Sequence, residues 1–199
     1  MSDSLITKKA IAASMKELMK RKSLEKITVS DIVQNCGLNR QTFYYHFQDK
    51  YDLVNWIYYS EVVSAVARNT GYSDWSDVIL DVLNIMKRDR HFYTSALNVS
   101  GQNAFQDYFF SVTKDLLLEI LSGIDDPKES GGSLEEGEKN FIADFYTYGL
   151  VGVVVQWARS GMREPPEEIV DRLRCVVEDS RFAAAARRLR RKKPPSPQR

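Results

Sequence analysis

A short segment between residues 40 and 46 carries the side chains whose types most clearly suggest chemistry in this sequence. An arginine fork can bind guanine and a primary amide can bind adenine, while aromatic faces and hydroxyls can contact thymine methyl groups and phosphates. The segment therefore suggests a surface that reads base edges. Its side chains are Arg40, Gln41, Thr42, Tyr44, Tyr45 and His46.

A helix over about residues 40–47 is expected to present these side chains together. Phe43 and Phe47 are four residues apart, so both point to one side of that helix and leave the polar side chains on the other. Asn39 can cap its N-terminus, because an asparagine oxygen accepts a hydrogen bond from a free amide of the first turn. The alternative is an amphipathic helix whose polar face only meets water, but such faces usually carry Glu, Lys and Ala.

A second short helix is expected directly before this one. Thr28 and Asp31 have the spacing of a capping box, so the helix begins there and runs to about Asn35. Gly37 then supplies the turn between the two helices. A longer helix over about residues 4–22 precedes both. Two short helices joined by a glycine turn form a helix-turn-helix unit, whose second helix lies against DNA.

The charge is distributed unevenly along the chain. The 199 residues have a formal net charge of only +1, which by itself argues against a nucleic-acid partner. Residues 1–50, however, carry +4, residues 51–180 carry −11, and residues 181–199 carry +8. The N-terminal and C-terminal segments are basic and the middle segment is acidic, so each segment attracts a different kind of partner. The net charge is therefore an average that excludes no partner.

The rest of the chain also has helical periodicity, and no β-hairpin signal appears. The Gly-, Ser- and acid-rich segment 123–138 is expected to be a loop, with a further break at Gly71-Tyr72. The sequence thus predicts an all-α protein with a largely disordered basic tail over residues 181–199. The helices expected after residue 48 cover about residues 49–69, 74–88, 89–97, 102–121, 139–160 and 167–179.

The string ITVSDIVQNCGLNRQTFYYHFQDKYDLV resembles the signature of the TetR family of bacterial transcription regulators. Val33 and Cys36 depart from the family, which usually has Ala at both places, and this implies slightly looser packing between the two short helices. The part RQTFYYHFQDKYDL also resembles the regulators of dihydroxyacetone kinase. The matching residues are Thr28, Ile32, Gly37, Leu38, Thr42, Tyr44, His46, Phe47, Lys50 and Leu53.

The resemblance implies a three-helix DNA-binding domain over residues 1–48 and a helical effector and dimerisation domain over residues 49–180. It also implies roles for individual residues in DNA binding. A packing role at the end of its helix is an alternative for His46. The residues implied to reach base edges are Arg40, Gln41 and Tyr44. Those implied to hold phosphates are Thr28, Thr42, Tyr45, His46 and Lys50, and Ser30 is a lesser candidate for a base or backbone contact.

The resemblance also implies partners. Helices over about residues 139–160 and 165–180 would pair with those of a second subunit, and the homodimer would bind a palindromic double-stranded DNA operator. A buried core helix is the alternative for residues 139–160. Aromatic residues between the helices suggest a cavity for a small-molecule effector, although aromatics at helical spacing more often form the core. In the dihydroxyacetone-kinase subgroup, a partner protein brings the signal instead. The expected ligand-binding residues are Trp56, Trp75, Tyr93, Phe109 and Tyr146.

Several other classes of function are not expected. The sequence has no Gly-rich phosphate loop, no metal-ligand spacing and no nucleophile with a partnered base, so we expect no enzyme, no cofactor and no metal. The N-terminus lacks the order of a signal peptide, and the longest uncharged apolar run, Gly149–Val155, is too short to span a bilayer. We therefore expect a cytoplasmic protein without a membrane contact. The remaining alternative is a helical protein-interaction module or co-regulator without its own small-molecule ligand.

Overall fold

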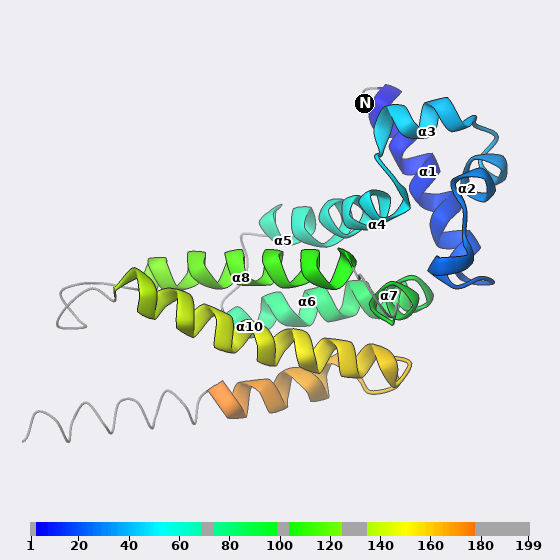
Figure 1. The fold of residues 1–199 in the computed structure, drawn as a ribbon. Coiled ribbons are helices and arrows are strands. Elements are labelled where there is room, and N and C mark those ends of the chain that lie inside the picture. The colour runs from blue at the N-terminus through cyan, green and yellow to red at the C-terminus, as the bar shows by residue number, and fades with distance from the viewer. Residues whose placement is uncertain (1–2, 69–73, 99–103, 125–134, 178–199) are drawn as a thin grey trace, which may run out of the picture.

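The computed structural model describes residues 3–68, 74–98, 104–124 and 135–177, and every regular element in these ranges is a helix. The expectation of an all-α fold is confirmed, and Figure 1 shows a small N-terminal group of helices at one end of a longer helical body. The predicted break at Gly71-Tyr72, most of the predicted loop 123–138 and the basic tail lie outside the described residues.

Capping hydrogen bonds define the helices of the N-terminal group. The Thr28 hydroxyl accepts from the Asp31 amide over 3.1 Å, and the Asp31 carboxylate accepts from the Thr28 amide over 2.8 Å, so the predicted capping box is confirmed. The Asn39 side chain accepts from the Thr42 amide over 2.8 Å, as expected of an N-cap. The helices are α1 (Asp3–Met19), the short 3-10 helix η1 (Leu24–Lys26), α2 (Val29–Asn35) and α3 (Arg40–His46).

Helix α1 ends three residues earlier than the sequence suggests. The amides of Arg21 and Lys22 both bond to the Leu18 carbonyl at 3.0 Å, which turns the chain toward η1. The turn brings Leu24, only 1% exposed, into the core. Burial of this leucine favours the turn over further helix, because removal of its side chain from water stabilises the fold.

The helix that connects the two parts of the chain is interrupted by a π-helical turn. The sequence predicts one helix over residues 49–69, but the i→i+5 pattern of η2 divides the segment into three pieces. The Asp49 carboxylate caps the first piece, because it accepts from the amides of Tyr51 and Asp52 at 2.7 and 2.9 Å. The pieces are α4 (Lys50–Tyr58), η2 (Tyr59–Val63) and α5 (Ser64–Arg68).

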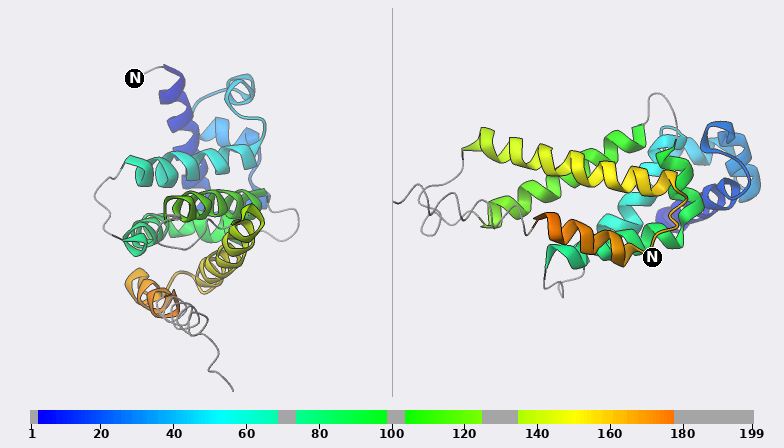
Figure 2. Two further views of the ribbon diagram at one scale, coloured as in Figure 1. Left: turned by 90° about the vertical axis from the view of Figure 1, so that its left-hand side faces the viewer. Right: turned by 90° about the horizontal axis from the view of Figure 1, so that it is seen from below.

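The body is built from long helices that pack side by side. Helix α8 packs along α10, and α7 lies at the end of the body beside α1 (Figures 1 and 2). The final helix, residues 166–177, follows a tight turn in which Gly161 and Met162 both have positive φ, 78° and 54°. The helices are α6 (Trp75–Arg88), α7 (Arg90–Leu97), α8 (Ala104–Ile124) and α10 (Glu136–Arg159).

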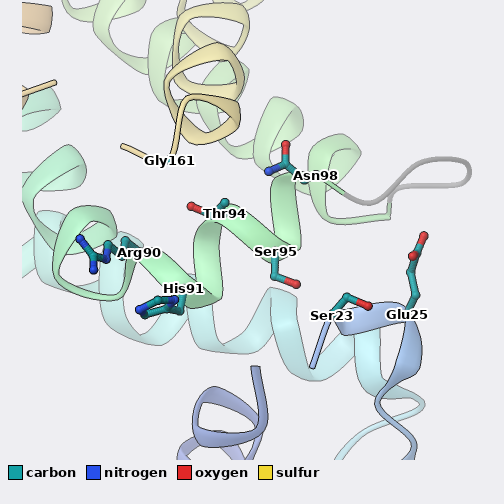
Figure 3. Close-up of a pocket in the computed structure, with 8 residues that line it drawn as sticks. All are labelled: Ser23, Glu25, Arg90, His91, Thr94, Ser95, Asn98 and Gly161. Atoms are coloured by element: carbon teal, nitrogen blue, oxygen red, sulfur yellow. The ribbon is translucent and has the colours of Figure 1, made fainter. Parts of the chain in front are cut away.

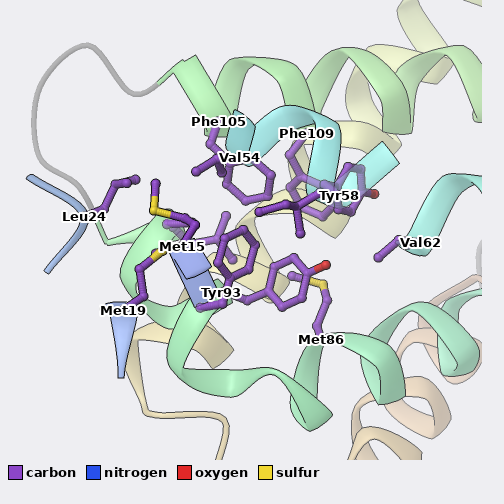
Figure 4. Close-up of a cluster of buried hydrophobic side chains, with 14 of the residues drawn as sticks. Met15, Met19, Leu24, Val54, Tyr58, Val62, Met86, Tyr93, Phe105 and Phe109 are labelled. Atoms are coloured by element: carbon purple, nitrogen blue, oxygen red, sulfur yellow. The ribbon is translucent and has the colours of Figure 1, made fainter. Parts of the chain in front are cut away.

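One continuous core joins the N-terminal group to the body (Figure 4). Tyr58 of α4 is the centre of its aromatic part, with ring centroids 5.4 Å from Phe109, 5.7 Å from Phe105 and 6.5 Å from Tyr93. All three pairs meet edge to face, the arrangement that ring quadrupoles favour. Burial raises the pKa of the Tyr58 hydroxyl far above its ordinary value, so the hydroxyl is neutral throughout the physiological range.

Helix α10 is long and apolar enough, by length and composition, to cross a membrane. The qualifying window of 18 residues has a mean hydropathy of 1.2, and 28% of it is buried. The expectation of no membrane contact considered only the uncharged run Gly149–Val155 and not the whole helix, which was predicted over about residues 139–160. A single helix of this kind is weak evidence for a membrane span, because a core helix of a soluble protein passes the same test.

Candidate nucleic-acid interface

Helix α3 is held in place by its two phenylalanines. Phe43 is fully buried and Phe47 is 3% exposed, so the i,i+4 pair faces the core as expected. The turn before α3 needs Gly37, whose φ of 69° lies in the left-handed region that favours glycine. After this turn the Leu38 amide bonds back to the Val33 carbonyl at 2.9 Å. The polar face of α3 is therefore fixed relative to α1 and α2.

That polar face is exposed and aromatic. Tyr44 and Tyr45 are 50% and 80% exposed, which is unusual for large side chains without an intermolecular role. The Arg40 guanidinium donates to the Tyr44 hydroxyl over 3.4 Å and lies 5.9 Å from the centre of that ring. The His46 ring lies edge-on to Tyr45 with centroids 4.9 Å apart. Together with the exposed Gln41, these side chains form one outward surface on α3.

The hydroxyls assigned to phosphate contacts are already engaged in capping. Thr28 Oγ1 donates to Asp31 Oδ2 over 2.8 Å, and Thr42 Oγ1 donates to Asn39 Oδ1 over 3.0 Å. The donor protons of both hydroxyls therefore serve the N-terminal ends of α2 and α3. Ser30 is half-buried on α2.

Lys50 has a structural role, because its ammonium is bonded to the backbone around η1. Its Nζ donates to the carbonyl oxygens of Leu24, Glu25 and Ile27 at 2.9, 3.0 and 2.9 Å. An ammonium has three N–H donors, and all three are used here. Burial is the main cause that lowers the pKa of Lys50 below its ordinary value. Lys50 thus holds the chain around η1 in place, whereas the resemblance assigned it to a phosphate.

The five aromatic residues expected to bind a ligand do not form one site. Tyr93 and Phe109 are closed into the core at 0% and 4% exposure. Trp56 packs edge-on against Phe47 with centroids 5.7 Å apart, so it supports the residue that follows α3. The helical periodicity places these five aromatic residues on inward faces, but it does not predict which other helix each ring packs against. Trp75 and Tyr146 lie half-buried on α6 and α10.

The structure instead has a polar cleft between the N-terminal group and the body. It has a volume of about 390 Å³ and lies where η1, α7 and the end of α10 meet. Ser95 points toward Ser23 (Figure 3), and its hydroxyl accepts a hydrogen bond from the Leu24 amide at 3.1 Å. The lining residues are Ser23, Glu25, Arg90, His91, Thr94, Ser95, Asn98 and Gly161.

The contacts of two further residues support α3 and were not predicted from the sequence. The Ser14 hydroxyl donates to the Ile32 carbonyl at 2.7 Å and accepts from the Asn35 amide group at 3.1 Å, which joins α1 to α2. The Lys8 ammonium lies over the rings of Phe47 and Trp56, 5.4 and 5.6 Å from their centres. Ser14 could have been noticed in the sequence, because it is a polar residue on the apolar side of α1. Nothing in the sequence distinguishes Lys8 from other exposed lysines.

A second surface of note lies on α10, far from α3. Phe141, Phe145 and Tyr148 are 74%, 68% and 70% exposed along one side of this helix. They continue into a groove of about 620 Å³ between α10 and the final helix, which includes Gly149 and Gly152. An added Cβ at either glycine would meet no atom within 4 Å, so these glycines do not approach a neighbour within this chain.

Comparisons with known proteins agree with this geometry. Residues 11–57 match the family described as bacterial regulatory proteins, tetR family, and residues 73–179 match the family described as transcriptional regulator C-terminal region. The dhaKLM operon transcriptional activator DhaS of Lactococcus lactis subsp. lactis (strain IL1403) is 30% identical over 153 residues, which are 77% of this chain and 80% of DhaS.

Solved structures share the fold. The structure of the dihydroxyacetone kinase operon activator DhaS is 25% identical, with a TM-score of 0.67 over 88% of this chain and 96% of DhaS. NalD of Pseudomonas aeruginosa is 18% identical, with a TM-score of 0.56 over 86% of this chain and 94% of NalD, and shows the fold alone. The matched families and DhaS are regulators of transcription and not enzymes. The chain therefore belongs to the TetR family of bacterial transcription regulators, within which it resembles the regulators of dihydroxyacetone kinase.

Proposed function

We propose that the protein binds a specific DNA sequence by placing α3 in the major groove. The outward face of α3 supports this most directly, because Arg40, Gln41 and Tyr44 are all exposed on it while Phe43 anchors its other side. The N-terminal residues of a recognition helix meet base edges in this type of docking. Tyr45 and His46, with the oxygens of Thr28, Ser30 and Thr42, contact the sugar-phosphate backbone around it.

The functional unit in this proposal is a homodimer on a palindromic operator. The exposed aromatic side of α10 and the adjoining groove supply an apolar surface of the kind that a subunit interface buries. A two-fold axis through α10 and the final helix presents two copies of α3 to two half-sites. Residues 1–48 then carry DNA binding, and residues 49–180 carry dimerisation and control. A protein that acts on the chromosome in this way is cytoplasmic.

A partner protein or a small ligand modulates DNA binding in this proposal. DhaS is described as an activator of the dhaKLM operon, and we propose a related operon-specific role for this chain. Tyr93 and Phe109 are packed into the core. Their packing favours a signal that arrives from a partner protein, or from a ligand that binds outside the aromatic core.

Selection of genomic fragments tests the DNA-binding proposal. The full-length protein is mixed with sheared DNA from its own genome, and the bound fragments are sequenced. We expect enrichment of a palindromic sequence, and tighter binding to it than to a shuffled fragment in a gel-shift titration at fixed salt. Absence of salt-dependent binding to any fragment would overturn the proposal and favour the helical protein-interaction module. Light scattering at micromolar concentration gives the mass of a dimer if the α10 surface is the interface.

A further inference from the structure

One lysine of α1 binds two carboxylates from two separate segments of the body. Lys16 Nζ lies 2.8 and 3.0 Å from the two carboxylate oxygens of Glu61, and 2.7 Å from Oδ2 of Asp89. Glu61 belongs to the π-helical turn η2, and Asp89 lies at the corner between α6 and α7. The three residues, called the Lys16 triad below, connect the DNA-binding domain to two separate parts of the body.

The side chains of the Lys16 triad are partly shielded from solvent, so the attraction between their charges is stronger than at the open surface. The side chains of Lys16, Glu61 and Asp89 are 19%, 34% and 29% exposed. Ion pairs at such sites are screened less by salt than pairs on the open surface. Two carboxylates facing one ammonium also make its loss costly, because the carboxylates would then repel each other in a partly desolvated site.

The backbone holds both carboxylates in fixed positions. The Asp89 carbonyl accepts from the amides of Phe92 and Tyr93 at 2.9 and 3.2 Å, which fixes the corner at the start of α7. Glu61 lies in the π-helical turn, and π turns occur frequently at functional sites. Without that turn, the residues after Tyr59 would rotate about the helix axis and Glu61 would face another direction.

Helix α1, which carries Lys16, is joined to α3 through contacts with α2. Ser14, two residues before Lys16, bonds to both the Ile32 carbonyl and the Asn35 side chain of α2. Helix α2 packs on α3. The angle at which α1 leaves the body therefore sets the position of α3 as well.

We propose that Lys16 is a positioning residue that fixes the angle of the DNA-binding domain on the body, and so determines the half-site spacing that the dimer accepts. This inference depends on the proposed function, since spacing has meaning only for a dimer with two recognition helices. Release of the Lys16 triad leaves α3 intact and frees its orientation, so recognition of a single half-site persists while the preference for one spacing is lost.

A measurement without DNA tests the positioning role. Spin labels are placed on the exposed positions Lys9 of α1 and Asp115 of α8, after replacement of Cys36 and Cys175 by alanine and dilution with unlabelled protein. We expect Lys16→Met to broaden the distribution of interspin distances and Lys16→Arg to restore a narrow one. Equal widths for the Lys16→Met variant and the parent would overturn the proposal, whether or not the protein binds DNA.

A matched charge variant gives the DNA test. Lys20→Met removes one positive charge directly after the end of α1, where Lys20 pairs with the nearby Glu17 rather than with the body. Gel shifts use the selected operator and versions with one or two extra base pairs between the half-sites. We expect Lys16→Met to reduce the preference for the natural spacing by about tenfold, within the usual range of coupling between sites, while Lys20→Met keeps it.

The outcomes separate the two proposals. If the parent protein binds no DNA, the proposed function fails while the interspin distances still decide the role of Lys16. If Lys16→Met and Lys20→Met lose the same affinity at every spacing, Lys16 contributes only charge and the inference is wrong. Glu61→Gln, which leaves the charge of α1 unchanged, is expected to show the same loss of spacing preference as Lys16→Met.

Discussion

Arg40 and Tyr44 lie against each other on the outward face of α3, with Arg40 Nη2 donating to the Tyr44 hydroxyl over 3.4 Å. The guanidinium carbon also lies 5.9 Å from the centre of the tyrosine ring. Such a contact restricts the rotamers of a long side chain, and in the proposed DNA complex this would lower the entropy lost on binding. The Arg40 guanidinium and the Tyr44 hydroxyl are therefore held in a defined position relative to each other.

Arg40→Ala is expected to remove sequence preference more than general DNA affinity. A bidentate contact to a base contributes about 1–3 kcal/mol of discrimination, so operator binding should weaken about tenfold or more relative to random DNA. Gel-shift titrations on both DNAs measure this ratio. Arg21→Ala is the control, because Arg21 is an exposed arginine of the same domain paired with Glu17. Equal losses on operator and random DNA would show that Arg40 contacts phosphate only.

Lys50→Met is expected to destabilise the fold. Three carbonyl oxygens around η1, two part-buried and one exposed, lose their donor, and a hydrogen bond to a charged group contributes about 1.5–3 kcal/mol. Urea unfolding measures the free energy, with the exposed Lys26→Met as the control of equal charge. The salt dependence of DNA binding should be the same in both variants. A Lys50→Met protein of parental stability with a smaller salt slope would restore Lys50 as a phosphate contact.

Phe145→Glu is expected to give a monomer. The side chain is 68% exposed on α10, so the substitution leaves the fold of one chain intact but places a charge in the proposed interface. Light scattering measures the mass, and operator affinity should fall because one half-site alone is then bound. Ile6→Glu, at another exposed apolar residue, should remain a dimer. A dimeric Phe145→Glu protein would move the interface away from this side of α10.

Asp31→Asn is expected to lower stability only where the carboxylate is charged. The hydrogen bonds from the Thr28 amide and hydroxyl hold the pKa of Asp31 below its ordinary value of 3.8. A depressed carboxyl pKa contributes stability that is fully present above pH 3.8 and is lost as the pH falls through the folded-state pKa. The difference in melting temperature between the parent and the variant should therefore be constant near neutral pH and shrink in acid. A difference that grows in acid would contradict the capping role.

The helix-turn-helix unit could be predicted from the sequence because its determinants are local. The capping oxygens of Thr28 and Asn39 act on amides three residues away, and Phe43 and Phe47 share a face through the helical period alone. The polar face of α3 follows from the same period. For this reason the sequence by itself determined the existence of the recognition helix and the identity of its outward side chains.

Tertiary structure decided how the remaining side chains are used. Lys50 binds carbonyl groups 23 to 26 residues away, and Lys16 binds carboxylates 45 and 73 residues away. No local period distinguishes these lysines from solvated ones, and none separates the buried Tyr93 from a residue that lines a cavity. Their partners are brought near only when the helices pack, because the energy of a charge or a ring depends on what surrounds it in space.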